Sequence, residues 1–343
     1  MATVLKIATG NTKPLISWVI LMRIDFFLSL LLAAMAATAA ASEFSPRAAE
    51  LALARHEKTS DGGKRYLTVR TNAPHNREVK FFYHVPAGYD PAAGRKYRVL
   101  VYFGGRNCSG EAEAGDKLGF AAWGDAHDVF IVGPGFRDDE YWRPERWSGK
   151  ALADAMALLG KMYNVKKDRL LFYGYSAGSQ CANLFAAHFA AQTVAYVAHG
   201  CGVFHAPSPK MRQVPGVVTC GDADVARYVI SRRFVRECRE MGVNVIFKSL
   251  PNHPHDVPPD SVRLAKEFLL YHHRRTAAEL RRDDAPVPEE KASLVGDDVD
   301  GVYYPADDPR VRFIEPRDRV FFSSRAVADA WGRPAPAAGA ARG

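Results

Sequence analysis

The sequence predicts an α/β fold with a mainly parallel central sheet and helices on both faces. Short apolar runs recur along the chain, stretches of helical periodicity separate them, and 48% of the residues are hydrophobic. Strands that are apolar on both sides are typical of parallel sheets, because helices cover each face. Right-handed crossovers then place the helices on both sides. At 343 residues the chain has room for one large domain with appendages.

The expected strands are apolar runs rich in β-branched and aromatic residues, and the expected helices carry apolar residues three or four positions apart. Lys64–Thr71 and Glu78–Val85 form an opening pair of strands, joined by a turn-rich stretch. The later strands are Tyr97–Phe103, Val129–Val132, Arg169–Tyr173, Val194–His199, Val217–Cys220 and Val243–Leu250. The helices are Asp116–His127, Gly149–Tyr163, Ala177–Phe189, Ala223–Met241 and Asp260–His273.

Residues 1–41 have the pattern of an export signal. Arg23 precedes the apolar run Phe26–Ala34, and Ala39-Ala40-Ala41 gives a small-residue cleavage pattern. Met22 is a possible true start, which gives a signal of ordinary length. A membrane anchor is the alternative, but Arg23 and Asp25 interrupt a continuous span. We therefore expect a secreted or periplasmic protein without stable membrane association after cleavage.

The rest of the chain divides into a main domain, residues 42–275, and a C-terminal extension, residues 276–343. The extension is charged and carries prolines, with one strand-like piece at Arg319–Phe322 and one helical piece at Ala326–Trp331. Its end, Pro334–Gly343, is a low-complexity run of alanine, proline and glycine, which predicts disorder.

Charge and cysteine content narrow the function classes. The net charge of +8 is scattered, with acidic runs such as Asp138-Asp139-Glu140 between the basic residues. Nucleic-acid binding needs a concentrated basic stripe, so a solvated surface is favoured and no nucleic-acid partner is expected. Export permits disulfides, and Cys201 and Cys220 each follow a strand-like run, so they form one candidate pair. Buried free cysteines are the alternative.

Gly174-Tyr175-Ser176-Ala177-Gly178 is the most informative motif. It lies between the apolar run Leu170–Tyr173 and the helical stretch that starts at Ala177. A chain that turns from strand to helix so abruptly presents the serine hydroxyl at the tip of a strained turn, at the positive end of a helix. We therefore expect Ser176 to be a nucleophile. The alternative is a plain turn in which Ser176 caps the helix.

A serine nucleophile needs a base and an orienting acid, which in this kind of fold follow in the order acid, then histidine. Asp224, after one predicted strand, is the preferred acid, with Asp222 as the alternative. His255, after the next strand, is the preferred base, with His253 as the alternative. His-x-His spacing also suits a metal pair, but no third ligand with suitable spacing is evident, so no metal is expected.

Two loops are expected to complete the site. The backbone N–H groups of Ala177 and Gly105 are the candidate oxyanion donors, because Gly105 follows the strand Tyr97–Phe103 and lets the backbone approach a substrate. The aromatic loop Gly133–Gly149 should border the site. Candidate substrate-binding residues are Trp142, Trp147 and Tyr175. The alternative for the aromatic loop is that its rings seal it onto the core.

These residues resemble the α/β-hydrolase superfamily, in particular secreted esterases of the polyhydroxybutyrate depolymerase and feruloyl or acetylxylan esterase type. The resemblance rests on Val85-Pro86-Ala87-Gly88-Tyr89, on Val99–Gly105, and on Tyr163–Arg169 running into Gly174–Gly178. It covers about Lys64 to His273 and implies the α/β-hydrolase fold, Ser176, Asp224 and His255 as a triad, no cofactor, and ester hydrolysis through an acyl-enzyme. This chain has Phe103-Gly104 where those esterases usually have His-Gly, and the tail after His273 has no counterpart.

The sequence therefore predicts an exported serine esterase that acts on a small-molecule or polymeric ester. One alternative is a serine peptidase of the prolyl oligopeptidase catalytic type, although no propeller-length N-terminal region precedes the motif. Another is a catalytically idle hydrolase-fold protein that binds polysaccharide or a partner. The sequence leaves the ester, the oligomeric state and the role of residues 276–343 open.

Overall fold

A computed structural model describes residues 57–274, 292–298, 300–314, 316–322, 324–325, 328–329 and 332–336. All of them belong to one compact unit, His56–Gly343. The predicted export signal, residues 1–41, lies outside the described residues, as does the end of the predicted disordered tail from residue 337 onward.

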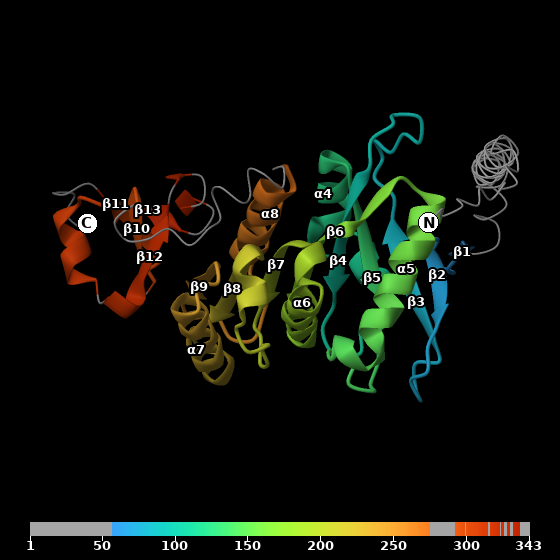
Figure 1. The fold of residues 1–343 in the computed structure, drawn as a ribbon, viewed down its shortest axis with the longest axis horizontal. Coiled ribbons are helices and arrows are strands. Elements are labelled where there is room, and N and C mark those ends of the chain that lie inside the picture. The colour runs from blue at the N-terminus through green and yellow to red at the C-terminus, as the bar shows by residue number, and fades with distance from the viewer. Residues whose placement is uncertain are drawn as a thin grey trace, which may run out of the picture. The chain divides into compact units, whose positions relative to one another are not determined.

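Within the described residues, the main sheet has nine strands in the order β1-β2-β3-β5-β4-β6-β7-β8-β9 (Figure 1). The first three strands and β5 pair antiparallel, and every other pairing in this sheet is parallel. The predicted mainly parallel sheet is therefore confirmed. The strands are β1 (Lys58–Thr59), β2 (Arg65–Arg70), β3 (Glu78–His84), β4 (Tyr97–Phe103), β5 (Val129–Pro134), β6 (Val165–Tyr175), β7 (Thr193–His199), β8 (Gly216–Gly221) and β9 (Val245–Leu250).

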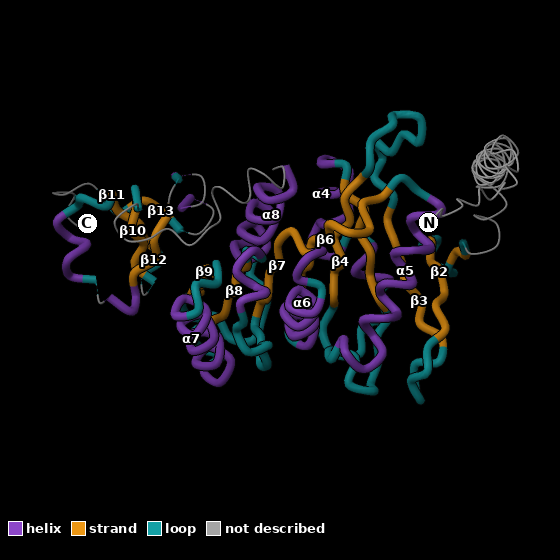
Figure 2. The backbone as a smooth tube through the Cα atoms, viewed as in Figure 1, coloured by secondary structure: helices purple, strands orange, loops and turns teal. Residues whose placement is uncertain are grey.

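Helices cover both faces of this sheet, because neighbouring residues of each strand point to opposite sides. Tyr102 packs on Phe120 of one helix, whereas the next residue, Phe103, packs on Phe185 of another. Figure 2 shows the helices alternating with the strands along the sheet. The helix of Phe120 shares its core cluster with the last helix, which contributes Phe268. The helices are α3 (Glu111–Ala114), α4 (Phe120–His127), α5 (Gly149–Met162), α6 (Ala177–His188), α7 (Val225–Glu240) and α8 (Pro259–Arg274).

Two predicted elements differ from the structure. The predicted helix Asp116–His127 is interrupted, because Leu118 and Gly119 have positive φ angles of 57° and 66°, and α4 begins only at Phe120. The predicted strand Arg169–Tyr173 extends to Val165–Tyr175 as β6. Its register with β4 shifts near its start, and such a bulge hides the strand period from sequence patterns.

A second, smaller sheet lies in the C-terminal extension, with the order β12-β10-β11-β13. The strand predicted at Arg319–Phe322 is confirmed as β12, but its three partners were not predicted. Pro334, expected to begin the disordered tail, pairs with β11 instead, because β13 adds in parallel along that strand. The predicted helical piece Ala326–Trp331 lies largely outside the described residues. The other strands are β10 (Leu294–Asp297), β11 (Val302–Pro305) and β13 (Arg333–Pro334).

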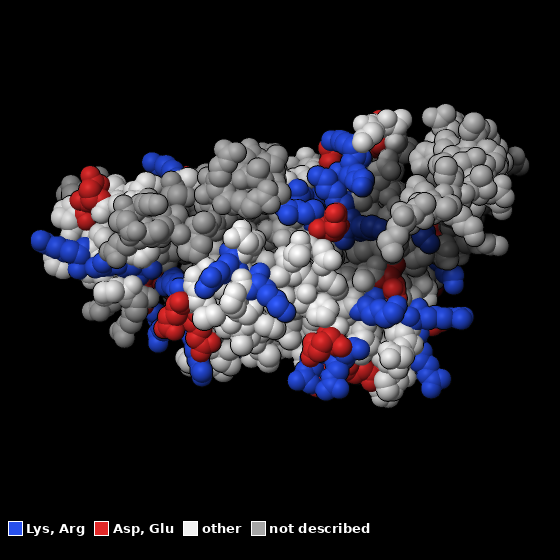
Figure 3. Space-filling model, viewed as in Figure 1, with Lys and Arg blue, Asp and Glu red and all other residues white. Residues whose placement is uncertain are grey.

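Three expectations from the sequence concern the surface charge, the pairing of cysteines and the crossing of a membrane. On the face shown in Figure 3, acidic side chains lie among scattered basic ones. The structure keeps all five cysteines as free thiols, so Cys201 and Cys220 form no disulfide, and burial raises the pKa of both to about 12. Among the described helices, none has the length and apolar character that a membrane crossing requires.

Candidate active site

Ser176 lies at the tip of the turn between β6 and α6, with φ 57° and ψ −122°. An L-residue rarely adopts this conformation, so the surrounding backbone must impose it. A Cβ atom at Gly174 would lie 1.9 Å from the carbonyl oxygen of Gly178. A Cβ atom at Gly178 would lie 2.1 Å from the carbonyl oxygen of Phe103. Both glycines of the motif are therefore required by close backbone contacts that hold the turn sharp.

The structure brings Ser176, His255 and Asp224 together in one hydrogen-bonded chain. His255 Nε2 lies 2.9 Å from Ser176 Oγ, and His255 Nδ1 lies 2.7 Å from Asp224 Oδ2. A carboxylate accepts hydrogen bonds, so Nδ1 carries the proton that it donates to Asp224. The lone pair of Nε2 is then free to accept the hydroxyl proton of Ser176. This arrangement can activate a serine hydroxyl.

The side chain of Asp224 is 8% exposed, so it is more buried than the side chain of His255. Its other carboxylate oxygen accepts a hydrogen bond from Arg227, whose Nη1 lies 3.1 Å from Oδ1. The sequence prediction did not include Arg227, although it follows the acid by three residues at the start of α7. The same Nη1 lies 3.5 Å from Oδ2, so the guanidinium helps to hold the carboxylate in place.

The alternatives from the sequence occupy other positions. His253 pairs with Asp256, at 3.3 Å from its Nδ1 to Oδ2, and not with Ser176. Asp222 is exposed, and its carboxylate accepts a hydrogen bond from the backbone N–H of Asn252 at 2.7 Å. It holds the histidine-bearing loop in shape.

The oxyanion candidates lie beside the same turn. Ala177 is the first residue of α6, and the first N–H groups of a helix have no intrahelical partner. The glycine pair after β4 is held close to the turn, because a Cβ atom at Gly178 would lie 2.3 Å from the carbonyl oxygen of Gly104. A Cβ atom at Gly104 would also lie 2.3 Å from Glu113 Oε1, whereas nothing lies within 4 Å of one at Gly105. Gly104 is thus needed for packing, and Gly105 faces open space.

Solved structures resemble this arrangement of strands and helices. A ferulic acid esterase matches with a TM-score of 0.50 and 16% sequence identity, over 64% of this chain and 98% of its own. The chain has the α/β-hydrolase fold. No protein-family model and no curated protein sequence matches the chain.

Two further solved structures match with similar coverage. A poly(3-hydroxybutyrate) depolymerase from Bordetella parapertussis has a TM-score of 0.49 and 18% identity, over 64% of this chain and 93% of its own. A fluorophosphonate-binding serine hydrolase from Staphylococcus aureus has a TM-score of 0.48 and 10% identity, over 62% of this chain and 99% of its own. At 16% identity, the likeness to the ferulic acid esterase shows the fold alone.

The loop that carries His255 is held by two side chains from the sheet of this α/β-hydrolase fold. The Tyr175 hydroxyl donates to the carbonyl of His255 at 2.7 Å, and the two rings stack with centroids 5.0 Å apart. His199, at the end of β7, donates from Nε2 to the carbonyl of Asp256 at 2.6 Å. Tyr175, expected to bind substrate, therefore contacts the histidine directly, and His199 was not predicted to have a role.

His199 has a fixed tautomer. A carbonyl oxygen can only accept, so the bond to Asp256 places the proton on Nε2, and Nδ1 accepts from the Thr219 hydroxyl. Burial lowers the pKa of His199 to about 4, so the ring is neutral at physiological pH. Its own carbonyl accepts the backbone N–H of Ser176 at 3.0 Å. One signal in the sequence marked this histidine: it stands at the carboxyl end of a strand, where sites of this fold gather.

The two tryptophans of the aromatic loop lie in different environments. Trp147 is buried, its Nε1 donates to the carbonyl of Asp139 at 2.7 Å, and its ring packs edge-on against Phe136. This contact seals the loop onto the core, which was the alternative considered for it. Trp142 is half-buried and contacts the ring of Tyr141. Among the described residues, no group of three or more metal-ligating side chains is present.

Proposed function

We propose that this protein is a serine esterase that hydrolyses carboxylic esters through an acyl-enzyme, with Ser176 as nucleophile, His255 as base and Asp224 as orienting acid. The observation that carries the proposal is the continuous chain from Ser176 Oγ to His255 Nε2 at 2.9 Å and from His255 Nδ1 to Asp224 Oδ2 at 2.7 Å. The strained turn that presents Ser176 and the α/β-hydrolase fold support it.

In the first half of the reaction, the Ser176 hydroxyl proton moves to His255 Nε2 while Oγ bonds to the ester carbonyl carbon. The carbonyl oxygen becomes an oxyanion, and we assign the N–H groups of Ala177 and Gly105 as its donors. Asp224 accepts from Nδ1 and stabilises the imidazolium that forms. When the tetrahedral intermediate collapses, the leaving alkoxide oxygen takes the proton from Nε2 and departs as an alcohol.

In the second half, a water molecule gives a proton to His255 Nε2 and bonds to the acyl carbon. The new tetrahedral intermediate releases the carboxylic acid, and Nε2 returns the proton to Ser176 Oγ. Every step uses groups that the site holds, and the balance of protons closes without a cofactor.

The substrate class is a small-molecule or polymeric carboxylic ester. Trp142 is the remaining aromatic candidate for a binding wall, because Trp147 is sealed into the core and Tyr175 supports His255. We also propose that the protein is exported after cleavage behind Ala41, from the pattern of residues 1–41. Sequencing the N-terminus of protein recovered outside the cytoplasm tests this, and a start at Ser42 is the expected result.

A fluorophosphonate probe tests the chemistry, because it phosphonylates only an activated serine. We expect the folded protein to be labelled once, and mass spectrometry of the tryptic peptides should place the label on Ser176. The variant Ser176→Ala should bind none while keeping the thermal unfolding temperature near that of the wild type.

The outcome of this labelling separates the function classes considered from the sequence. Folded protein that takes up no label contradicts the proposed esterase and favours an idle binding protein. Labelled protein that cleaves peptide amides faster than p-nitrophenyl esters or feruloylated sugars, compared by kcat/KM, favours the peptidase. Label on Ser179 in place of Ser176 would contradict the assigned nucleophile.

A further inference from the structure

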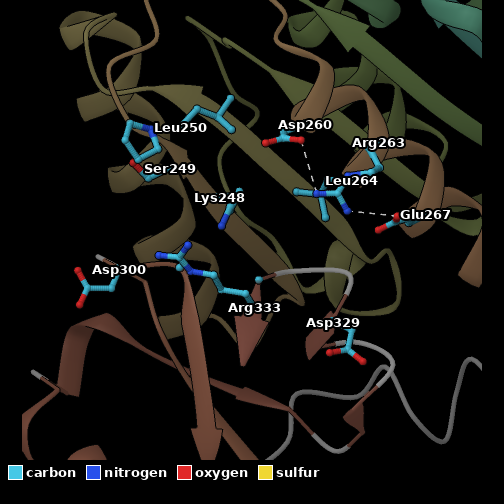
Figure 4. Close-up of a pocket in the computed structure, with 13 residues that line it drawn as sticks. Lys248, Ser249, Leu250, Asp260, Arg263, Leu264, Glu267, Asp300, Asp329 and Arg333 are labelled. Atoms are coloured by element: carbon cyan, nitrogen blue, oxygen red, sulfur yellow. Dashed lines mark hydrogen bonds and ion pairs between the residues drawn. The ribbon is translucent and has the colours of Figure 1, made fainter. Parts of the chain in front are cut away.

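A polar cavity of about 390 Å³ lies between the catalytic domain and the C-terminal sheet (Figure 4). Strand β9 and helix α8 form one wall, and the turn before β11 together with β13 forms the other. Its charged lining comprises three cations and four carboxylates. They are Lys248, Arg263, Arg333, Asp260, Glu267, Asp300 and Asp329.

Most of these charges are already neutralised by a neighbour. Arg263 lies 3.6 Å from Asp260 and 3.4 Å from Glu267, so it engages two carboxylates. Asp329 accepts from the Tyr303 hydroxyl and lies 3.6 Å from Arg325. The single charge of Arg263 balances only one of its two carboxylates, so Lys248 and Arg333 remain beside Asp300 and one further carboxylate charge on the α8 side.

Lys248 and Arg333 point into the same space (Figure 4). Neither side chain has a hydrogen-bond or ion-pair partner among the residues that the structure describes. Lys248 is half-buried, and a Cβ atom at Gly301 would lie 2.6 Å from its Nζ, so this glycine makes room for the ammonium group. Burial, and next the charge of Arg333, lower the pKa of Lys248. Lys248 and Arg333 repel one another, and an anion bound between them would offset that repulsion.

The two walls are fixed by contacts outside the cavity. Arg232 of α7 lies 2.8 Å from Asp318, and Arg239 lies 3.3 Å from the buried Asp298. The cavity is therefore a feature of the docked C-terminal sheet. Leu250 and Pro251, which begin the loop that carries His255, also line it.

We propose that this cavity binds a small organic anion through its phosphate or carboxylate oxygens, with Lys248 and Arg333 as the binding cations. The ammonium of Lys248 offers three hydrogen-bond donors, and the guanidinium of Arg333 offers donors that lie in one plane. Both groups can donate to phosphate or carboxylate oxygens. An inorganic phosphate ion would fill only a small part of this cavity. Its volume is in the range of cavities that bind ligands with an organic body. This site does not depend on the proposed esterase activity.

Thermal unfolding of the full chain tests the site, with inorganic phosphate and citrate as probes and sodium chloride at matched ionic strength as reference. Ligands that bind only the folded state raise the unfolding temperature and reach saturation in the way a binding isotherm does. We expect a saturable rise of about 2–4 °C with at least one probe. A phosphate effect without a citrate effect would identify phosphate chemistry, and the reverse would identify carboxylates.

Three variants test whether Lys248 and Arg333 cause the rise in unfolding temperature. Lys248→Met should abolish the saturable rise, and Arg333→Gln, a change at an exposed residue, should reduce it severalfold in apparent affinity. Lys266→Met removes another half-buried lysine, which donates to the carbonyl of Gly119 at 3.0 Å, and should retain the full rise. The proposal is overturned if neither probe gives a saturable rise, or if Arg333→Gln and Lys248→Met respond as the wild type does.

Discussion

One loop carries two histidines, His253 and His255, and each pairs with an aspartate, but the two pairs differ in distance and burial. His255 lies 2.7 Å from Asp224, and the two side chains are 29% and 8% exposed. His253 lies 3.3 Å from Asp256, and those side chains are 39% and 46% exposed. The first pair reaches Ser176 and the second does not. Both pairs consist of a histidine and an aspartate, so burial and reach distinguish them.

The origin of each partner explains the difference. Asp256 lies three residues from His253 in the same loop, so their pairing fixes nothing outside that loop. Asp224 comes from the loop after β8, so its pairing with His255 ties together two loops at the edge of the sheet. A buried charged hydrogen bond also gains strength from its low-dielectric surroundings, whereas an exposed pair contributes little.

The largest expected effect comes from removing one histidine at a time. His255→Ala should lower kcat on a p-nitrophenyl ester by about 10⁶-fold, because the serine then has no base. His253→Ala should change kcat by less than about threefold, since an exposed pair contributes at most about 1 kcal/mol. Steady-state kinetics on both variants measures this, and comparable losses would contradict the assignment of His255.

Substitution of the two aspartates should show the same contrast in kcat, with smaller losses. Asp224→Asn should lower kcat by about 10⁴-fold, because an amide cannot stabilise the imidazolium and permits the wrong tautomer. Asp256→Asn keeps the size of the side chain at a half-buried position that does not contact His255 through its carboxylate, and it should leave kcat nearly unchanged. If Asp256→Asn proved the more damaging of the two, the loop would use its local pair in catalysis.

The fold and the identity of the site residues could be predicted because both follow local patterns. Apolar runs marked most strands of the main sheet, and the glycines around Ser176 marked a turn whose backbone contacts exclude any side chain. The choice of His255 over His253 rested on its deeper position in the loop that leads into the last helix. The hydrogen bonds that distinguish the two arise only when distant loops meet.

What could not be predicted depends on contacts between segments that are remote in sequence. The strands of the C-terminal sheet are short, so their pattern is too brief to give a period, and only β12 was foreseen. Tyr175, next to Ser176 in the sequence, was predicted to bind substrate. Its hydroxyl instead reaches the carbonyl of His255, which lies 80 positions along the chain.

A third histidine, His199, should make the free energy of unfolding depend on pH. Its pKa is lowered to about 4 in the folded protein, mainly by burial, against 6.5 in an unfolded chain. Between these values the unfolded chain binds a proton that the folded chain does not. The free energy of unfolding should therefore fall as the pH falls from about 6.5 to about 4, by up to about 1.4 kcal/mol per pH unit from this residue.

The variant His199→Gln isolates this contribution, because its amide can still donate to the carbonyl of Asp256 but does not titrate. Urea unfolding at several pH values should show the wild type losing its advantage over the variant as the solution is acidified. His273, whose pKa burial also lowers to about 4, remains in both proteins and gives the same background slope. A difference that stays constant with pH would contradict a neutral, buried His199.

The smallest expected effect concerns how tightly the His255 loop is held. Tyr175→Phe removes the hydroxyl that donates to the carbonyl of His255 but keeps the stacked ring. A hydrogen bond of this kind contributes about 0.5–1.5 kcal/mol, so kcat should fall by about three- to tenfold while KM changes little. Stopped-time labelling with the fluorophosphonate probe should slow by the same factor, because it reports the activated serine without substrate binding.

Tyr97→Phe is the matched control, since Tyr97 also donates its hydroxyl to a backbone carbonyl, that of Gly88 at 3.2 Å. Tyr97 begins β4, at the opposite end of the strand from the glycine pair near Ser176. Tyr97→Phe should lose at least as much unfolding free energy, because the Tyr97 hydroxyl also accepts from the backbone N–H of Asp90 at 2.9 Å, but only Tyr175→Phe should lose labelling rate. Equal labelling rates would mean that the loop holds His255 without Tyr175. A difference would show that the Tyr175 hydroxyl positions His255 through its backbone carbonyl, a support that the local His253–Asp256 pair does not replace.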